Sequence, residues 1–327
     1  MTLNCASFFA GVGGIDLGFE QAGFKTVYAN EIDSKAVVTF ESNFKNIKVD
    51  NRDIHNVVED IKKGIDPFNG KEINVILAGF PCQAFSIAGY QEGFDDKKGR
   101  GGLFFEVMKI VDFAKPDFIF LENVKNLMNH DKGKTYEIIK GALLAKQYYV
   151  DQRVFNSMEY GNVPQNRERI YIVAFKNKAN LIEFKWPDPI ALNNTLDKVL
   201  DYDTKFNDIY YYNKERFKRF SEIEPCITKM NTVYQWRRVY VRENKSNVCP
   251  TLTANMGTGG HNVPLILTKH GIRKLTPREC FDLQGFPPDF ILPKTLANSY
   301  LYKQAGNSVS VSVIQRIAEN VYNALKE

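Results

Sequence analysis

Short apolar runs alternate with amphipathic runs over the first 175 residues of the chain. Runs typical of buried strands are Cys5–Phe9, Thr26–Ala29, Val75–Ala78, Phe118–Leu121 and Ile170–Phe175. Runs typical of helices are Ile15–Ala22, Lys35–Asn43, Leu103–Phe113 and Tyr136–Ala145. This alternation predicts an α/β fold in which helices cover both faces of a parallel sheet. Such sheets bind ligands at the carboxyl ends of their strands, so the residues that follow each strand are the first candidates for function.

The pattern changes after Trp186-Pro187-Asp188-Pro189, which indicates a domain boundary. From 191 to 268 the periodicity weakens and aromatic, Asn and Thr residues become frequent, which predicts a smaller domain of short strands and loops. Helical patterns return at 276–284, where Pro277 suits a first turn, and at 309–325. We therefore expect a discontinuous first domain, residues 1–188 and 269–327, into which a second domain, residues 189–268, is inserted.

The composition is that of a globular protein: 327 residues suit two domains, and 44% of them are hydrophobic and 25% charged. No run approaches 18 apolar residues, so no membrane span is expected. The first ten residues lack a basic region and start a strand pattern, so no signal peptide is expected and the location would be cytoplasmic.

The five cysteines are odd in number and lack metal-ligand spacing, which favours free thiols in a reducing compartment over disulfides or a zinc site. Four of them, Cys5, Cys226, Cys249 and Cys280, are expected to be small buried apolar residues. Cys82 differs because it follows a strand, on a loop.

The positive charge is concentrated in one segment. Residues 205–245 contain ten Lys or Arg and five Asp or Glu, and the rest of the chain has 33 of each sign, so this segment carries the whole net charge of +5. It also contains Tyr210, Tyr211, Tyr212, Tyr234, Trp236 and Tyr240. Basic residues mixed with aromatics suit a nucleic-acid surface. On charge alone, a solvated face with a few core aromatics fits equally well.

Three motifs near strand ends suggest an adenosine-bearing ligand. The glycine-rich Phe9–Gly14 permits close backbone approach, but its spacing differs from the dinucleotide pattern, which disfavours an NAD-dependent dehydrogenase. Glu31 can bind a ribose diol, whereas Asp33 is equally a helix cap. Asp53-Ile54 could bind an adenine amino group. S-adenosylmethionine fits this set better than NAD.

Three further polar motifs lie at strand ends: Gly79–Gln83, Glu122–Val124 and Gln165–Arg169. By the rule for such sheets they should meet at one edge. A thiolate there could add to C6 of a cytosine, which makes C5 reactive towards a sulfonium methyl group, while an acid such as Glu122 protonates N3. Arg169 could hold O2 and orient that carboxyl group, and Arg167 could favour the thiolate. A base in a duplex must first be flipped out.

In the order of its motifs the chain resembles the bacterial DNA (cytosine-5) methyltransferases of restriction–modification systems. Each motif is weak alone, but the ordered set is specific and covers nearly the whole length. The matching motifs are Phe9–Gly14, Asn30–Asp33, Asp53-Ile54, Phe80–Gln83, Glu122–Val124, Gln165–Arg169, Arg278–Cys280 with Gln284–Pro287, and Gly306–Val309. The resemblance implies a Rossmann-like S-adenosylmethionine-dependent methyltransferase sheet, in the discontinuous domain, with residues 189–268 as an inserted target-recognition domain.

The resemblance also implies roles for individual residues. Cys82 would be the covalent nucleophile, Glu122 would contact the cytosine N3 and amino group, and Arg167 and Arg169 would line the cytosine pocket. The residues around the cofactor would be Phe9, Gly11, Gly13, Gly14, Glu31, Ile32, Asp53, Ile54, Pro81, Leu103, Asn307 and Ser308. Ile32 replaces an aromatic residue that the family often has beside the adenine.

DNA contacts follow in the same way. The segment Gln83–Gly102 would be a mobile loop that closes over DNA, with Ser86 and Arg100 touching phosphate, although its end is a residue or two longer than the common pattern. Cys249–Thr253 resembles the family's Thr-Leu element, which supports the phosphate of the flipped nucleotide. Candidates for base or backbone contacts are Gln235, Arg237, Arg238, Arg242, Thr251 and Asn255, and each arginine could equally hold phosphate or form a salt bridge.

The expected partner is double-stranded DNA with a short palindromic target, and the expected products are methylated DNA and S-adenosylhomocysteine. We further expect a monomer that needs no metal and no membrane. We also expect a restriction endonuclease that shares the target but does not bind the protein.

Two alternatives stay open. One is an RNA (tRNA) cytosine-5 methyltransferase, against which the long basic region argues. The other is a non-enzymatic binder, which the presence of Cys82, Glu122 and Arg169 disfavours.

Overall fold

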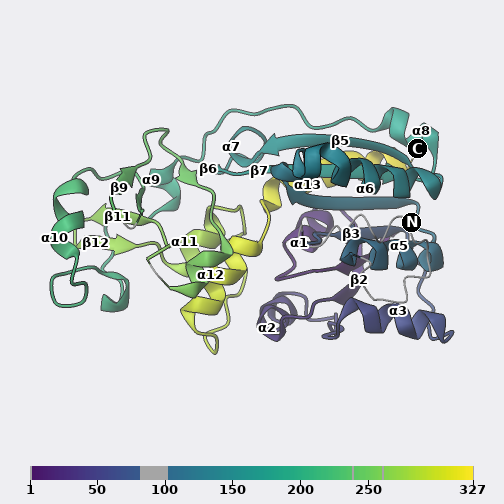
Figure 1. The fold of residues 1–327 in the computed structure, drawn as a ribbon, viewed down its shortest axis with the longest axis horizontal. Helices are drawn as coiled ribbons and strands as arrows, with labels where there is room; N and C mark the ends of the chain where they lie inside the picture. Colours follow the sequence, from purple (N-terminus) through teal and green to yellow (C-terminus); the bar gives the residue numbers. More distant parts are fainter. Residues whose placement is uncertain (1, 82–101, 238, 260, 327) are drawn as a thin grey trace. The chain divides into compact units, whose positions relative to one another are not determined.

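The computed structural model describes residues 2–81, 102–237, 239–259 and 261–326, which form two compact units (Figure 1). The sheet unit comprises Met1–Phe155, Glu168–Pro187 and Ile314–Glu327. The second unit comprises Asn156–Arg167 and Asp188–Val313. The chain leaves the sheet unit after Pro187, within the Trp-Pro-Asp-Pro motif, and returns to it at Ile314.

The sheet unit is built on a six-stranded sheet in the order β2-β1-β3-β4-β7-β5. Its strands are β1 (Asn4–Phe8), β2 (Lys25–Asn30), β3 (Val75–Ala78), β4 (Phe118–Val124), β5 (Tyr149–Asn156) and β7 (Glu168–Phe175). Strands β2, β1, β3 and β4 are parallel, but β7 runs antiparallel to β4. The expectation of a parallel sheet was therefore wrong for β7, and the sheet is mixed.

Helices cover both faces of this sheet. They are α1 (Gly14–Gln21), α2 (Ser34–Asn43), α3 (Ile54–Lys62), α5 (Leu103–Ala114), α6 (Lys134–Ala145), α8 (Lys178–Glu183) and α13 (Val311–Lys326), and the short turns η1 (Lys125–Met128) and η2 (His130–Gly133) follow β4. Alternate residues of β4 face opposite ways: Ile119 and Leu121 join the core formed with α3, α5 and α6, while Phe120 packs edge-on against Phe19 of α1. Burial on both faces explains why the central strands are apolar throughout.

The second unit contains a four-stranded antiparallel sheet in the order β12-β11-β8-β9 and a small parallel pair, β10 and β6. Its strands are β6 (Gln165–Asn166), β8 (Tyr234–Trp236), β9 (Val241–Glu243), β10 (Cys249–Pro250), β11 (Leu265–Thr268) and β12 (Gly271–Lys274). Its helices are α7 (Ser157–Tyr160), α9 (Leu196–Val199), α10 (Phe220–Ile223), α11 (Pro277–Asp282) and α12 (Asn298–Asn307), with the turns η3 (Asp208–Tyr210), η4 (Glu224–Cys226) and η5 (Ala254–Thr258).

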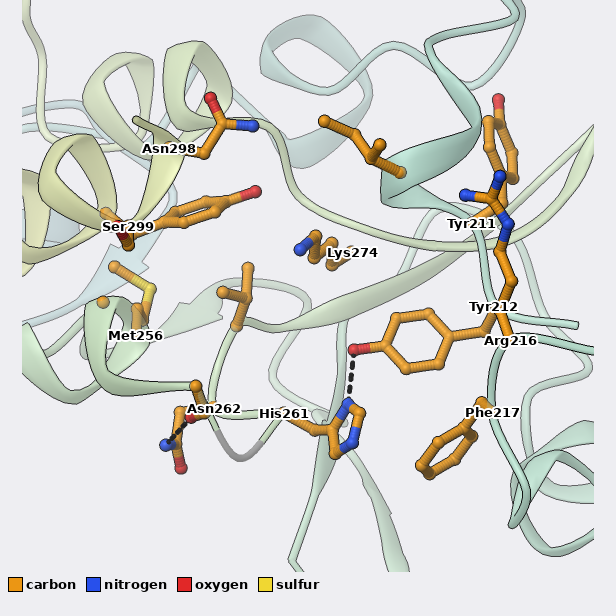
Figure 2. Close-up of a pocket in the computed structure, with 15 residues that line it drawn as sticks. Tyr211, Tyr212, Arg216, Phe217, Met256, His261, Asn262, Lys274, Asn298 and Ser299 are labelled. Atoms are coloured by element: carbon orange, nitrogen blue, oxygen red, sulfur yellow. Dashed lines mark hydrogen bonds between the residues drawn. The ribbon is translucent and has the colours of Figure 1, made fainter. Parts of the chain in front are cut away.

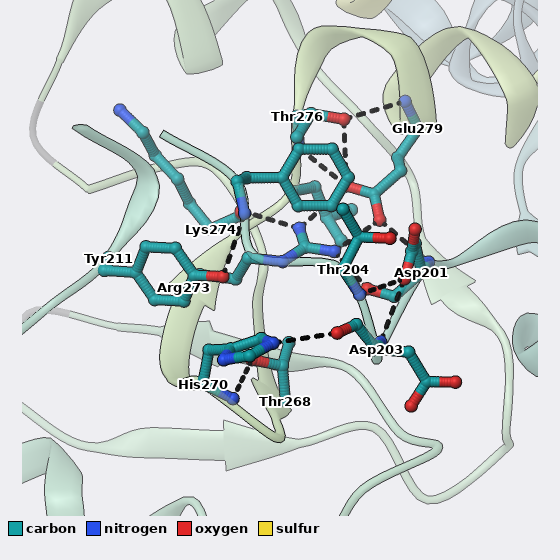
Figure 3. A network of polar contacts seen from close by, with 12 residues as sticks. Asp201, Asp203, Thr204, Tyr211, Thr268, His270, Arg273, Lys274, Thr276 and Glu279 are labelled. Atoms are coloured by element: carbon teal, nitrogen blue, oxygen red, sulfur yellow. Dashed lines mark hydrogen bonds and ion pairs between the residues drawn. The ribbon is translucent and has the colours of Figure 1, made fainter. Parts of the chain in front are cut away.

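Strand β12 keeps the chain beyond residue 268 in the second unit. This strand pairs with β11 from Leu265↔Lys274 to Thr268↔Gly271, so the chain beyond residue 268 stays attached to the small sheet. A buried ion pair then ties β12 to α11: Arg273 donates to both carboxylate oxygens of Glu279, at 2.8 and 2.7 Å, and to the backbone oxygen of Asp201 (Figure 3). The helix predicted at 276–284 is α11, which begins at Pro277 after a capping box formed by Thr276 and Glu279.

Cysteine burial follows the expectation at three positions. Cys5, Cys249 and Cys280 are buried, but Cys226 is exposed, and the expectation was wrong there. Cys226 ends η4, where Ile223 and Ile227 on either side occupy the apolar core. Within the described part of the chain, no helix is long and apolar enough to cross a membrane, and no cluster of three His, Cys, Asp or Glu residues could hold a metal ion.

Candidate active site

The direction of β7 brings two of the three predicted catalytic motifs together. The first residues of β7 pair with the last residues of β4, with Val124 opposite Arg169 and Glu122 opposite Tyr171. A parallel strand would have placed its first residues at the other edge of the sheet. Because β7 is antiparallel, Arg169 lies at the same edge as Glu122 and as Gly79, which follows β3.

Glu122 and Arg169 form an ion pair there, with 3.1 Å between Glu122 Oε1 and Arg169 Nε. Both side chains are mostly buried, with exposed fractions of 11% and 13%. A β-carbon at Gly79 would lie 3.6 Å from Glu122 Oε2, so the carboxylate lies against the backbone that leads to Cys82. The carboxyl and guanidinium groups are thus fixed relative to each other beside the loop of the predicted nucleophile.

The neighbour of Glu122, Asn123, anchors that loop. Its Nδ2 atom donates to the backbone oxygen of Phe80 at 2.8 Å, and its Oδ1 accepts from the Val124 amide. Phe80 is buried and packs against Phe104 of α5. The backbone of Phe80, two residues before Cys82, is therefore fixed. Cys82, Ser86 and Arg100 themselves lie outside the residues that the structure describes. The sequence analysis gave Asn123 no role of its own.

Glu31 organises the glycine-rich loop. Its carboxylate accepts from the amides of Gly11 and Asp33, both at 2.8 Å, while burial raises the pKa of the carboxyl group. Phe9, Gly11 and Gly13 all have positive φ angles, of 55°, 58° and 86°. A β-carbon at Gly13 would come within 2.3 Å of the Phe44 ring, whereas one at Gly11 would meet nothing within 4 Å. A glycine is thus needed at position 13 for packing against Phe44, just before α1 begins at Gly14. Gly11 instead borders open space that a ligand can enter.

The other predicted cofactor residues of the sheet unit differ in how exposed their side chains are. Ile32 is 63% exposed and Pro81 is exposed, so both can contact a ligand, and Leu103 is partly buried at the start of α5. Asp53 caps α3 by accepting from the His55 amide at 3.0 Å, which lowers the pKa of its carboxyl group, and Ile54 is buried behind it. Asn307 and Ser308, at the end of α12, belong to the second unit.

Arg167 has a different environment from Arg169. Its side chain is buried in the second unit, and its guanidinium donates to the backbone oxygens of Leu252, at 2.8 Å, of Gly306, at 3.3 Å, and of Ser308. Gln165 also accepts from the Leu252 amide, at 3.1 Å. Arg167 thus joins the Thr-Leu element to the end of α12 through backbone carbonyl groups.

Most of the predicted DNA contacts lie on one hairpin or beside the Thr-Leu element. Gln235 of β8 pairs with Arg242 of β9, and Arg237 Nη2 donates to Gln235 Oε1 at 2.9 Å. Val239 at the turn is 82% exposed, and Arg238 beside it is outside the described residues. Thr251 Oγ1 donates to the backbone oxygen of Asn166, and Asn255 lies in η5.

Comparisons with known proteins show the family to which the chain belongs. The family model of the C-5 cytosine-specific DNA methylases matches residues 3–323. Type II methyltransferase M.Bsp6I of Bacillus sp. (strain RFL6) is 55% identical over 325 residues, covering 99% of each chain. Type II methyltransferase M.HhaI of Haemophilus parahaemolyticus is 36% identical, covering 99% of this chain and 95% of that one.

Two solved structures share the fold at low identity. A DNMT2 mutant from Spodoptera frugiperda has a TM-score of 0.72 at 18% identity, covering 98% of this chain and 100% of that chain. The methyltransferase EhMeth of Entamoeba histolytica has a TM-score of 0.71 at 20% identity, covering both chains fully. These likenesses concern the fold alone.

Proposed function

The chain belongs to the C-5 cytosine-specific DNA methylases and is a type II modification methyltransferase (DNA (cytosine-5-)-methyltransferase, EC 2.1.1.37), and from this premise we propose which residues perform the reaction. The family uses S-adenosylmethionine as methyl donor and DNA as substrate. Membership of this family favours DNA over RNA as the substrate, and an enzyme over a non-enzymatic binder.

The proposed reaction begins at Cys82. Its thiolate adds to C6 of a flipped cytosine, the displaced electron pair moves towards N3, and Glu122 donates a proton there. C5 would then take the methyl group from the sulfonium sulfur, which leaves as the thioether of S-adenosylhomocysteine. Loss of the C5 proton to a base would expel the thiolate, and N3 would return its proton to Glu122. Arg169 would hold O2 of the base and orient the Glu122 carboxyl group. The ion pair of Glu122 with Arg169, beside Gly79, is the observation that supports this assignment, because it places the carboxyl and guanidinium groups together at the strand end that leads to Cys82.

The residues at the carboxyl ends of β1 and β2 suit the donor. S-adenosylmethionine supplies an electrophilic methyl group when bound. Glu31, held by two amides, would accept from the ribose hydroxyl groups, and Asp53 with Ile54 would contact the adenine edge. The open space beside Gly11 supports close approach of the ligand to this loop. Phe9, Ile32, Pro81 and Leu103 would add apolar contacts.

We propose that the second unit recognises a specific short sequence of duplex DNA. The exposed side chains of Arg237 and Arg242 on the β8–β9 hairpin support this assignment. Arg167 would act as a positioning residue, because its guanidinium fixes the Thr-Leu element. A monomeric enzyme, accompanied by an endonuclease that recognises the same site, completes the proposal.

The decisive experiment replaces Cys82. Cys82→Ala should lower transfer of tritiated methyl groups to DNA by at least about 10³-fold, while binding of S-adenosylhomocysteine is retained, because the covalent step is lost. A duplex containing 5-fluorocytosine should form a covalent complex with the wild type and not with the variant. Cys226→Ala, at an exposed position, is the matched control and should behave as wild type. Turnover by Cys82→Ala would remove Cys82 from the mechanism.

A further inference from the structure

A second site lies entirely within the second unit. It is a pocket of about 350 Å³ between the segment after η3, the loop after η5, β12 and the start of α12 (Figure 2). We call it the aromatic pocket. The residues that matter for the argument are Tyr212, Arg216, Phe217, His261, Lys274 and Tyr302. None of them is among the predicted contacts to cofactor, cytosine or DNA.

Lys274 is the central charge of the aromatic pocket. Its ammonium nitrogen lies 5.6 Å from the ring centroid of Tyr302 and 5.9 Å from that of Tyr210, and burial lowers its pKa. No carboxylate of the described residues lies within ion-pair distance of this nitrogen, and no acidic residue lines the pocket. Arg216 adds a second cation to the lining. A partly buried cation without a counter-charge is costly, so the site favours an anion.

One wall of the pocket is aromatic. The ring centroids of Phe217 and His261 are 4.5 Å apart, and those of Tyr212 and Phe217 are 5.3 Å apart. Tyr212 is hydrogen-bonded through its hydroxyl to His261 Nδ1 at 2.9 Å, as Figure 2 shows. Burial lowers the pKa of His261, so the imidazole is a neutral ring at neutral pH. Because the planes of Tyr212 and Phe217 lie at 88° to each other, a planar ligand can stack on one ring and meet the other with its edge.

We propose that the aromatic pocket binds a nucleotide, with its phosphate beside Lys274 and Arg216 and its base against the rings of Tyr212 and Phe217. Lysine binds phosphate as a point charge, and aromatic rings stack on bases of any sequence. The volume lies within the range of small-molecule pockets, about 300–1,000 Å³. The nucleotide is either part of the DNA substrate or free in solution. The first source rests on the proposed role of the second unit in DNA binding, whereas the second does not.

The direct test measures binding of thymidine 5′-monophosphate to the full chain by calorimetry, with S-adenosylhomocysteine present in saturating amount to fill the cofactor site. The nucleotide should bind at least ten times more tightly than thymidine or inorganic phosphate alone. Lys274→Gln should weaken nucleotide binding at least tenfold. Lys294→Gln, at an exposed lysine of the same unit outside the pocket, is the charge-matched control and should bind as wild type.

Competition distinguishes the two sources. If the nucleotide belongs to DNA, thymidine 5′-monophosphate should displace a duplex that carries the target, and Lys274→Gln should weaken DNA binding and abolish this competition. If the nucleotide is free, duplex and thymidine 5′-monophosphate should bind together. Either result supports the pocket.

Nucleotide binding that Lys274→Gln leaves unchanged, or no binding at millimolar concentration, would overturn the proposal. A normal affinity of the variant for S-adenosylhomocysteine establishes that the protein is folded. These readouts are binding constants, so they are independent of the Cys82 experiment, and either proposal can fail without the other.

Discussion

Two neighbouring residues at the end of β4 make different contacts because their side chains face different ways. Glu122 forms an ion pair with Arg169, and Asn123 donates to the backbone of Phe80. We propose the first side chain as a proton-transfer group, whereas the second fixes the backbone at Phe80, ahead of Cys82. The Glu-Asn pair could be found from the sequence as a motif, but the role of Asn123 could not, because it depends on a contact 43 residues away.

Glu122→Gln should lower kcat by about 10²-fold or more, because an amide cannot donate a proton to N3 as a carboxylic acid does. The dissociation constant for target DNA should change by less than about threefold, since glutamine keeps the size and hydrogen-bonding capacity of the side chain. Single-turnover methyl transfer and DNA binding measured side by side would check this.

Glu168→Gln is the control for that experiment, because Glu168 is a neighbouring carboxylate paired with Lys125 at the surface. It should retain near-normal turnover. A loss of DNA affinity by Glu122→Gln without a loss of rate would show that Glu122 binds rather than donates.

Asp16 predicts a pH dependence of stability. Its carboxyl group is fully buried, and burial raises its pKa to about 7 although Ser7 donates a hydrogen bond to it at 3.0 Å. The folded state therefore binds more protons than the unfolded state between about pH 4 and 7. The contribution of Asp16 to stability is fully present below pH 4 and is lost as the pH rises to 7.

Asp16→Asn should remove this dependence. The free energy of unfolding of the variant, relative to wild type, should rise by up to about 4 kcal/mol between pH 4 and pH 7.5. Urea unfolding can be followed through Trp186, the tryptophan of the sheet unit, in a Trp236→Phe background. A constant difference across this range would mean that Asp16 does not titrate there.

At the scale of elements, the pattern of apolar positions predicted most of the sheet unit. The expected strand at 75–78 is β3, and the expected helix at 136–145 is within α6. The helix α3 was missed although Ile54, Val57 and Val58 have helical spacing and are buried. The direction of β7 could not be predicted, because an apolar strand buried on both faces has the same composition in either direction.

A close approach of two backbones in the second unit gives a prediction for α12. A β-carbon at Gly306 would lie 2.1 Å from the carbonyl carbon of Thr253, so Gly306→Ala must separate α12 from η5. We expect a loss of about 1–3 kcal/mol in the free energy of unfolding of this unit. Weaker DNA binding should accompany it, since Arg167 bonds to both Gly306 and Leu252.

Urea unfolding followed through Trp236 in a Trp186→Phe background would measure the effect on the second unit. Gly141→Ala is the control substitution, because a β-carbon there, in α6, meets nothing within 4 Å. It should leave stability unchanged or raise it by up to about 1 kcal/mol. Equal effects of the two substitutions would exclude the steric explanation.

For the whole molecule, the division into two compact units falls after Pro187 and again after Val313. Patterns within a segment cannot reveal which sheet β12 joins, since that depends on pairing with β11 and on the ion pair of Arg273 with Glu279. The same limit hid the position of Arg167, whose motif borders a strand of the sheet unit while its side chain is enclosed by the second unit.

The uneven charge of the chain predicts how salt affects DNA binding. Residues 205–245 carry the whole net charge of +5, and Arg237 and Arg242 are exposed on the hairpin within that segment. Each phosphate contact that is lost should reduce the slope of log K against log salt concentration by about 0.9. The double variant Arg237→Gln, Arg242→Gln should therefore bind non-target duplex with a slope smaller by about 1.8.

The control is the double variant Lys45→Gln, Lys62→Gln, at two exposed lysines of the sheet unit. It makes the same change in net charge and should leave the slope unaltered. A hairpin double variant that keeps the wild-type slope but loses discrimination between target and non-target duplex would instead place both arginines on base edges, because such contacts carry sequence information and release few counterions.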